Sequence, residues 1–170
     1  MSRAWNLLPG AAALLLLAHC GGGSSPAPAT DAAVIPGDDG ASTFAGCASD
    51  PRLDRFSLGL TKAGFGGRLQ LRLLAADPGP PIKGVNAWTV EVDDAQGAAQ
   101  AAAVIKVTPF MPDHGHGTSV TPVVTAQSAP GHYGVAPLYL YMAGLWQVTL
   151  DVTTSAGVND VVVLSFCVER

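Results

Sequence analysis

The sequence predicts an all-β domain, an immunoglobulin-like antiparallel β-sandwich of about seven strands. Several segments alternate apolar and polar residues with a period of two, which is the pattern of a half-buried strand. Turn-forming Gly, Asn, Asp and Pro residues separate these segments at short intervals, as in sandwich proteins. The only run that looks helical, 98–103, is short. These three observations together exclude a helical or mixed fold.

Seven segments carry the strand pattern. They are residues 68–73, 88–93, 104–110, 119–125, 133–141, 146–153 and 161–168. Pro122 marks the fourth as an edge strand, and we expect the fifth to form one strand or two, broken near Pro137. The last segment is apolar on both faces, which predicts a central strand. Trp88 and Trp146 each begin an alternating face, so we expect both in the core.

The first residues have the features of a bacterial export signal. Arg3 supplies a positive charge, and the apolar run 7–18 is too short to span a bilayer. The run ends in Leu17-Ala18-His19-Cys20, which resembles the lipobox of bacterial lipoproteins, although His19 stands where that pattern has a small residue. The resemblance implies that residues 1–19 are a signal peptide and that Cys20 is lipidated. The alternative is ordinary cleavage nearby without a lipid.

A tether and one domain follow. No aspartate comes after Cys20, which favours the outer membrane in the lipoprotein pattern, and the lipid would be the only membrane anchor. Residues 20–43 are rich in Gly, Ser, Pro and Ala, so we expect a flexible linker. Residues 44–170 have the length of one domain with one core. Their place would be the periplasm or the cell surface.

The net charge and the cysteines exclude nucleic-acid binding and a CxxC site, and they predict a disulfide. The net charge is -4, so there is no basic footprint for nucleic acid. Once Cys20 is assigned to the lipid, Cys47 and Cys167 remain as an even pair in an oxidising compartment, which predicts a disulfide. Two free buried thiols are the alternative. A CxxC redox or metal motif is excluded, because the two cysteines are far apart in the sequence.

The stretch 110–117, Phe-Met-Pro-Asp-His-Gly-His-Gly, carries the clearest chemical signal. His114 and His116 are two residues apart, so an extended backbone directs both imidazoles to the same side. Imidazole binds copper, zinc and nickel, and a thioether from Met111 favours Cu(I). Met142 is a further thioether candidate and His132 a weaker imidazole candidate. The alternative is a polar hairpin tip whose histidines face solvent, with Met142 as core filler.

These motifs resemble the YtkA-like and FixH-like domains. The resemblance covers residues 65–168 and rests on the turn at 109–117, on Gly131-His132-Tyr133 and on Met142-Ala143-Gly144-Leu145-Trp146. It implies a small envelope-anchored β-sandwich that handles or senses copper. The implied ligands are Met111, His114, His116 and Met142, with His132 less well matched.

Three functions compete at this point. The first is a non-catalytic copper-binding accessory protein that serves an unspecified envelope protein. The second is a structural or protein-interaction module with no metal site. The third is a zinc hydrolase using Asp113, His114 and His116, which we disfavour because catalytic zinc needs three fixed ligands and a base. No nucleophile elbow, phosphate loop or zincin motif occurs in the sequence, so we expect no enzyme.

Overall fold

The computed structural model describes residues 46–169. The predicted signal peptide, Cys20 and the whole of the predicted linker lie outside the described residues. Within the described part, nine strands form two antiparallel sheets, and the only helix is a single 3-10 turn, η1 (Cys47–Ser49). The prediction of an all-β antiparallel sandwich is therefore confirmed.

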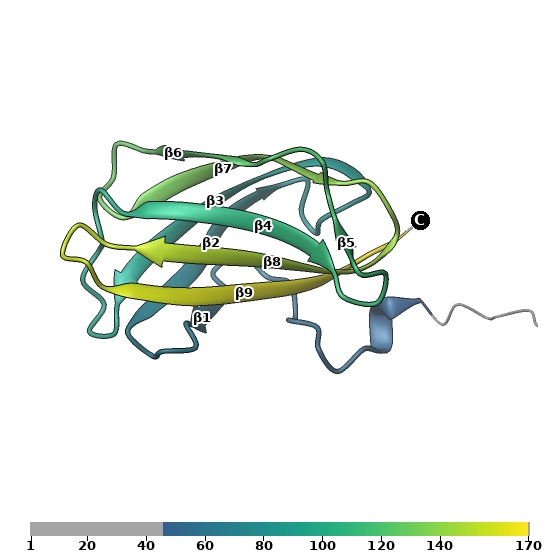
Figure 1. Ribbon diagram of the computed structural model, residues 1–170, viewed down its shortest axis with the longest axis horizontal. Coiled ribbons are helices and arrows are strands. Elements are labelled where there is room, and N and C mark those ends of the chain that lie inside the picture. The colour runs from purple at the N-terminus through teal and green to yellow at the C-terminus, as the bar shows by residue number, and fades with distance from the viewer. Residues whose placement is uncertain (1–45, 170) are drawn as a thin grey trace, which may run out of the picture. The chain divides into compact units, whose positions relative to one another are not determined.

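The two sheets pack face to face (Figure 1). The five-stranded sheet has the order β1-β2-β3-β7-β6, and the four-stranded sheet has the order β5-β4-β8-β9. The strands are β1 (Thr61–Ala63), β2 (Leu69–Asp77), β3 (Gly84–Asp94), β4 (Val104–Met111), β5 (His116–Gly117), β6 (Val123–Ala126), β7 (His132–Leu140), β8 (Gly144–Thr153) and β9 (Asn159–Val168).

The core lies between the sheets and follows the predicted alternation. In β4, in the first half of β2 and over most of β3 and β8, every second side chain is buried, because successive residues of a strand point to opposite faces. Trp88 and Trp146 are both buried, as predicted. Trp88 packs edge-on against Phe166 of β9, with ring centroids 5.5 Å apart.

The prediction of a central strand at 161–168 is wrong. Among the described residues, β9 forms the edge of the four-stranded sheet and has β8 as its one strand partner. Its other edge is covered by irregular chain, since Asp54 N donates to Ser165 O at 2.8 Å and Phe65 N to Val161 O at 2.9 Å. Irregular chain thus takes the place of a second neighbouring strand along this edge, and an apolar run does not distinguish the two cases.

Strand number and boundaries differ from the prediction in small ways. The two additional strands, β1 and β5, have three and two residues and form by pairing with longer neighbours, so they show no periodicity of their own. β7 remains one strand through Pro137, with a register shift in its pairing with β3 at that point. β6 begins after Pro122. The helical-looking run 98–103 is a turn, in which Ala102 has a φ of 56°.

One buried tyrosine holds that turn. The Tyr133 hydroxyl accepts a hydrogen bond from Ala103 N at 2.8 Å and donates one to Gln100 O at 2.6 Å. We expect Tyr133→Phe to lower the free energy of unfolding by about 1–3 kcal/mol, because it leaves a partly buried N–H and C=O without partners. Urea denaturation of both proteins measures this difference. An unchanged midpoint would show that water replaces the hydroxyl without cost.

One end of the sandwich gathers the ends of several elements. β4 ends there and β5 begins, β7 ends and β8 begins, and η1 lies at the same end (Figure 1). A disulfide between Cys47 and Cys167 ties η1 to β9, with Cα atoms 5.3 Å apart. The segments that sequence analysis singled out, 110–117 and 142–146, therefore meet at this end.

Candidate metal-binding site

The His-x-His segment is a tight turn between two paired strands. Met111 of β4 lies opposite His116 of β5. The turn closes through the carbonyl of Met111, which accepts hydrogen bonds from the backbone N–H groups of His114 and Gly115 at 3.2 and 2.9 Å. Gly115 has a φ of 69°, a conformation that favours glycine. Strand pairing and hydrogen bonds with Met111, the last residue of β4, thus fix the backbone of both histidines.

Both candidate thioethers belong to one small apolar cluster at this end. Met111 is fully buried together with Leu140, Trp146 and Val168. Met142 is half-buried and packs against the same cluster. The Trp146 indole N–H donates to the Met142 carbonyl at 2.9 Å, which fixes the turn between β7 and β8.

Gly144 lies where one methionine and one histidine approach each other. A Cβ placed on this glycine would meet Met111 Cε at 2.7 Å and His114 Nε2 at 3.8 Å. Gly144 also has a φ of +135°, which L side chains rarely adopt. Because glycine has no side chain, the methyl end of the Met111 thioether packs directly against Gly144, and an imidazole nitrogen of His114 lies nearby.

The second histidine is held from the other sheet. The rings of His114 and His116 lie 5.6 Å apart between centroids. His116 Nδ1 lies 2.9 Å from the Tyr141 hydroxyl, and the two rings are stacked at a centroid distance of 5.6 Å. Because the polar contact uses Nδ1, the remaining ring nitrogen, Nε2, is available to a ligand.

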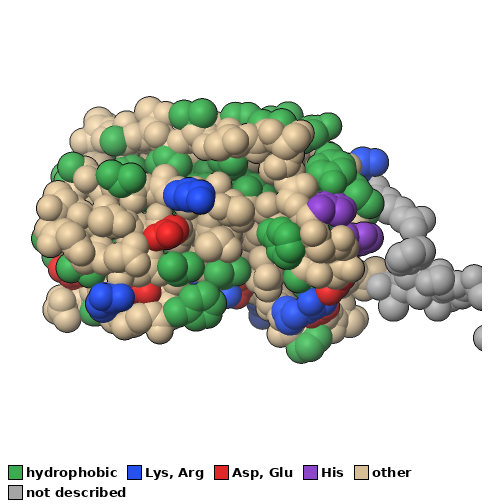
Figure 2. Space-filling view, in the orientation of Figure 1, with side chains coloured by type: hydrophobic (Ala, Val, Ile, Leu, Met, Phe, Trp, Pro, Cys, Tyr) green, Lys and Arg blue, Asp and Glu red, His purple; other side chains and the backbone are tan. Residues whose placement is uncertain are grey.

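An open pocket of about 960 Å³ adjoins these side chains. Its lining includes His114, Met142 and Gly144, together with Asp113 and the two disulfide-bonded residues, Cys47 and Cys167. In Figure 2 two histidine side chains lie together on the surface at this end of the domain. A small ion or ligand can therefore reach the histidines from solvent.

Asp113 is already engaged and is not a free ligand. Its carboxylate accepts two hydrogen bonds from Arg52, at 2.7 and 2.8 Å. Hydrogen bonding to this guanidinium holds the pKa of Asp113 below its usual range. Arg52 binds Asp50 in the same way and lowers its pKa to about 2. The zinc hydrolase hypothesis is weakened, because its third ligand serves as an ion-pair partner.

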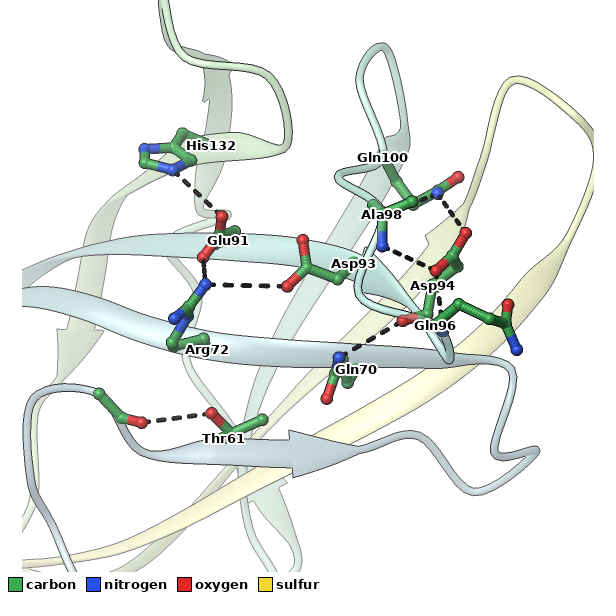
Figure 3. Close-up of polar contacts among 11 residues, drawn as sticks. Thr61, Gln70, Arg72, Glu91, Asp93, Asp94, Gln96, Ala98, Gln100 and His132 are labelled. Carbon is green, nitrogen blue, oxygen red and sulfur yellow. Dashed lines mark hydrogen bonds and ion pairs between the residues drawn. The ribbon is translucent and has the colours of Figure 1, made fainter.

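His132 lies away from the other candidates. It begins β7, whereas Tyr141 follows the end of that strand, and nine strand residues span roughly 30 Å. Its Nε2 faces Glu91 at 3.5 Å, beside Arg72 and Asp93 (Figure 3). Burial, helped by the charge of Glu91, raises the pKa of Asp93 there. The structure does not bring His132 to the His-x-His turn, so it is not a ligand of the same site.

The donor types present fit a soft metal better than a hard one. Within residues 46–169 no group of three or more His, Cys, Asp and Glu side chains could hold a metal ion. A site at this end would therefore depend on His114 and His116 together with the thioethers of Met111 and Met142. Two imidazoles with thioether sulfur are a donor set that copper accepts, Cu(I) in particular.

Three residues of this end were not singled out as functional from the sequence. Gly144 lies within the motif 142–146 and Tyr141 directly before it, so their place beside Met142 was the available signal. Arg52 lies 61 residues from Asp113 in the chain and has no motif around it. No sequence pattern connects two residues so far apart.

The fold and these residues define a β-sandwich domain with a histidine- and methionine-bearing end. The family model described as YtkA-like matches residues 70–151, a little less than half of the chain. No curated protein matches the chain. A crystal structure of FetP from uropathogenic E. coli strain F11, expressed in the periplasm of E. coli, is similar at 15% identity and a TM-score of 0.43. That similarity covers 67% of this chain and 95% of FetP, and it is too low to carry a functional argument.

Proposed function

We propose that this protein is a non-catalytic copper-binding accessory lipoprotein of the bacterial cell envelope. The observation that carries the proposal is that a methionine and a histidine approach each other at Gly144, where Met111 packs against the glycine and His114 Nε2 lies nearby. Met142 and His114 also line one pocket. His114 and Met142, from two different turns, thus supply both donor types at one accessible place, and Met111 is buried beside them.

The ligands would be His114 and His116 through imidazole nitrogen and Met111 and Met142 through thioether sulfur. Such a ligand set would bind copper but would not supply the base that catalytic turnover needs. Asp113, the nearest carboxylate in sequence, is paired with Arg52 and so is not placed to act as a base. A bound copper ion would be stored, sensed or passed to an envelope protein.

The envelope location rests on the sequence and on the role proposed here. The lipobox-like Leu17-Ala18-His19-Cys20 supports lipid attachment, with the outer membrane favoured, and the following segment would act as a tether. Among the described residues, no helix is long and apolar enough to cross a membrane. FixH-like proteins, which the sequence resembles, carry a transmembrane helix and are linked to copper supply for respiratory oxidases. We do not extend that oxidase link to this protein.

Copper titration of the purified protein tests the proposal. We expect one Cu(I) per protein, measured with a competing chelator, and Cu(II) binding measured by calorimetry. The His114→Ala, His116→Ala double variant should bind at least roughly 100-fold more weakly, since even the loss of outer partners of metal ligands costs 10–100-fold. Replacing Met142 with leucine should weaken Cu(I) more than Cu(II), because thioethers prefer the softer ion.

His132→Ala is the matched control, because it removes one imidazole from the other end of the domain. It should leave copper affinity unchanged. Weak binding that is equal in the wild type and the double variant would reject the copper site. The domain would then be the structural or interaction module that the sequence left open.

A further inference from the structure

The contact between His116 and Tyr141 joins the two sheets at the candidate site. His116 belongs to β5, a two-residue strand at the edge of the four-stranded sheet. Tyr141 follows the end of β7 in the other sheet. The 2.9 Å contact between Nδ1 and the hydroxyl therefore holds the His116 ring from outside its own hairpin.

Tyr141 is itself held on several sides. Its ring meets the edge of the fully buried Trp146 at a centroid distance of 5.8 Å and stacks with Tyr139 at 6.2 Å. The residue after it, Met142, is fixed by the indole hydrogen bond to its carbonyl. These contacts fix the position of the hydroxyl that faces His116. A partner in a fixed position can favour one tautomer of an imidazole.

A neutral imidazole carries its proton on one nitrogen and has a lone pair on the other. The group that bonds the first nitrogen decides which nitrogen can bind a metal. In known metal sites the ligating histidine commonly donates its other ring N–H to an oxygen, which fixes both the tautomer and the ring orientation. The Tyr141 oxygen lies 2.9 Å from Nδ1 of His116, where such an acceptor would be. Among the described residues, no hydrogen bond is made by Nε2 of His116.

We infer that Tyr141 is a positioning residue whose oxygen accepts a hydrogen bond from His116 Nδ1–H and so presents Nε2 as the copper-binding atom. The use of Nε2 rests on the proposed function. The tautomer itself is a property of the metal-free protein and is decided without copper.

Nitrogen-15 NMR of the His116 ring in the metal-free protein, with the ring neutral, tests the tautomer. In the wild type we expect a protonated Nδ1 and an unprotonated Nε2, which two-bond proton–nitrogen correlations distinguish. Tyr141→Phe keeps the stacked ring and removes the hydroxyl, so the population should move toward the Nε2–H form. Tyr139→Phe removes a hydroxyl from the neighbouring ring of the same stack and should leave the tautomer unchanged.

Copper affinity of the same three proteins is the second readout. Tyr141→Phe should weaken copper binding by about 10–100-fold, and Tyr139→Phe should not. A wild-type ring protonated at Nε2, a tautomer unaffected by Tyr141→Phe, or equal affinities in wild type and Tyr141→Phe would each overturn the inference. If the wild type binds no copper, the proposed function fails, and the NMR comparison still decides whether Tyr141 sets the tautomer.

Discussion

Replacing Cys47 and Cys167 together by alanine is expected to lower the free energy of unfolding by about 4–5 kcal/mol. The two cysteines are 120 residues apart, so their disulfide closes nearly the whole domain into one loop. In the chain-entropy model the stabilisation grows with loop length and reaches about 4.7 kcal/mol for 100 residues. Urea denaturation of the oxidised wild type and the double variant measures the loss, provided that both unfold with the same slope.

Two controls separate chain entropy from local packing. The wild type reduced by a dithiol should lose the same stability as the double variant, because both lack only the crosslink. Arg52→Ala breaks the ion pairs that join Asp50 and Asp113 without touching the crosslink, and such exposed pairs contribute little. A loss no larger than that of Arg52→Ala would contradict the entropic account and indicate strain or residual structure in the unfolded chain.

The sequence predicted the fold where side-chain alternation alone decides it. The Leu69, Leu71 and Leu73 series and the Trp88 to Val92 series lie inward as expected. Prediction failed where distant chain decides the environment. Loops at Asp54 and Phe65, and not a strand, hydrogen-bond to the outer edge of β9, and nothing in its own sequence indicates this.

At the candidate site, too, the local motifs were predictable from the sequence and the long-range contacts were not. The turn at His114 and the segment at Met142 were found because each motif is local, and the structure brings both to one pocket. The arrangement around them was not predictable from spacing. Whether Arg52 or solvent binds Asp113, and whether Tyr141 reaches His116, depends on how the two sheets stack.

Asp160 is the second residue whose replacement should have a large effect. This carboxylate is only 3% exposed and accepts hydrogen bonds from the backbone N–H groups of Gly66, Arg68 and Leu69 at 2.7, 2.8 and 3.1 Å. It thereby fastens the turn between β1 and β2 to β9. Asp160→Ala leaves these donors without partners, so we expect a loss of roughly 3 kcal/mol or more in urea denaturation.

The stabilisation by the Asp160 carboxylate should depend on pH in one direction. Burial alone would raise the pKa of Asp160, but the backbone N–H donors, led by Gly66 and Arg68, outweigh it and hold the pKa below its usual range. The carboxylate therefore contributes stability that is fully present above the unfolded pKa of about 3.9 and is lost as the pH falls through the lower folded value. The stability difference between wild type and Asp160→Asn should shrink as the pH falls below about 4. Asp77→Asn makes the same charge change at an exposed position and should show no such convergence. If the stability difference for Asp160→Asn stays constant in acid, the shape of the side chain and not its charge stabilises this corner.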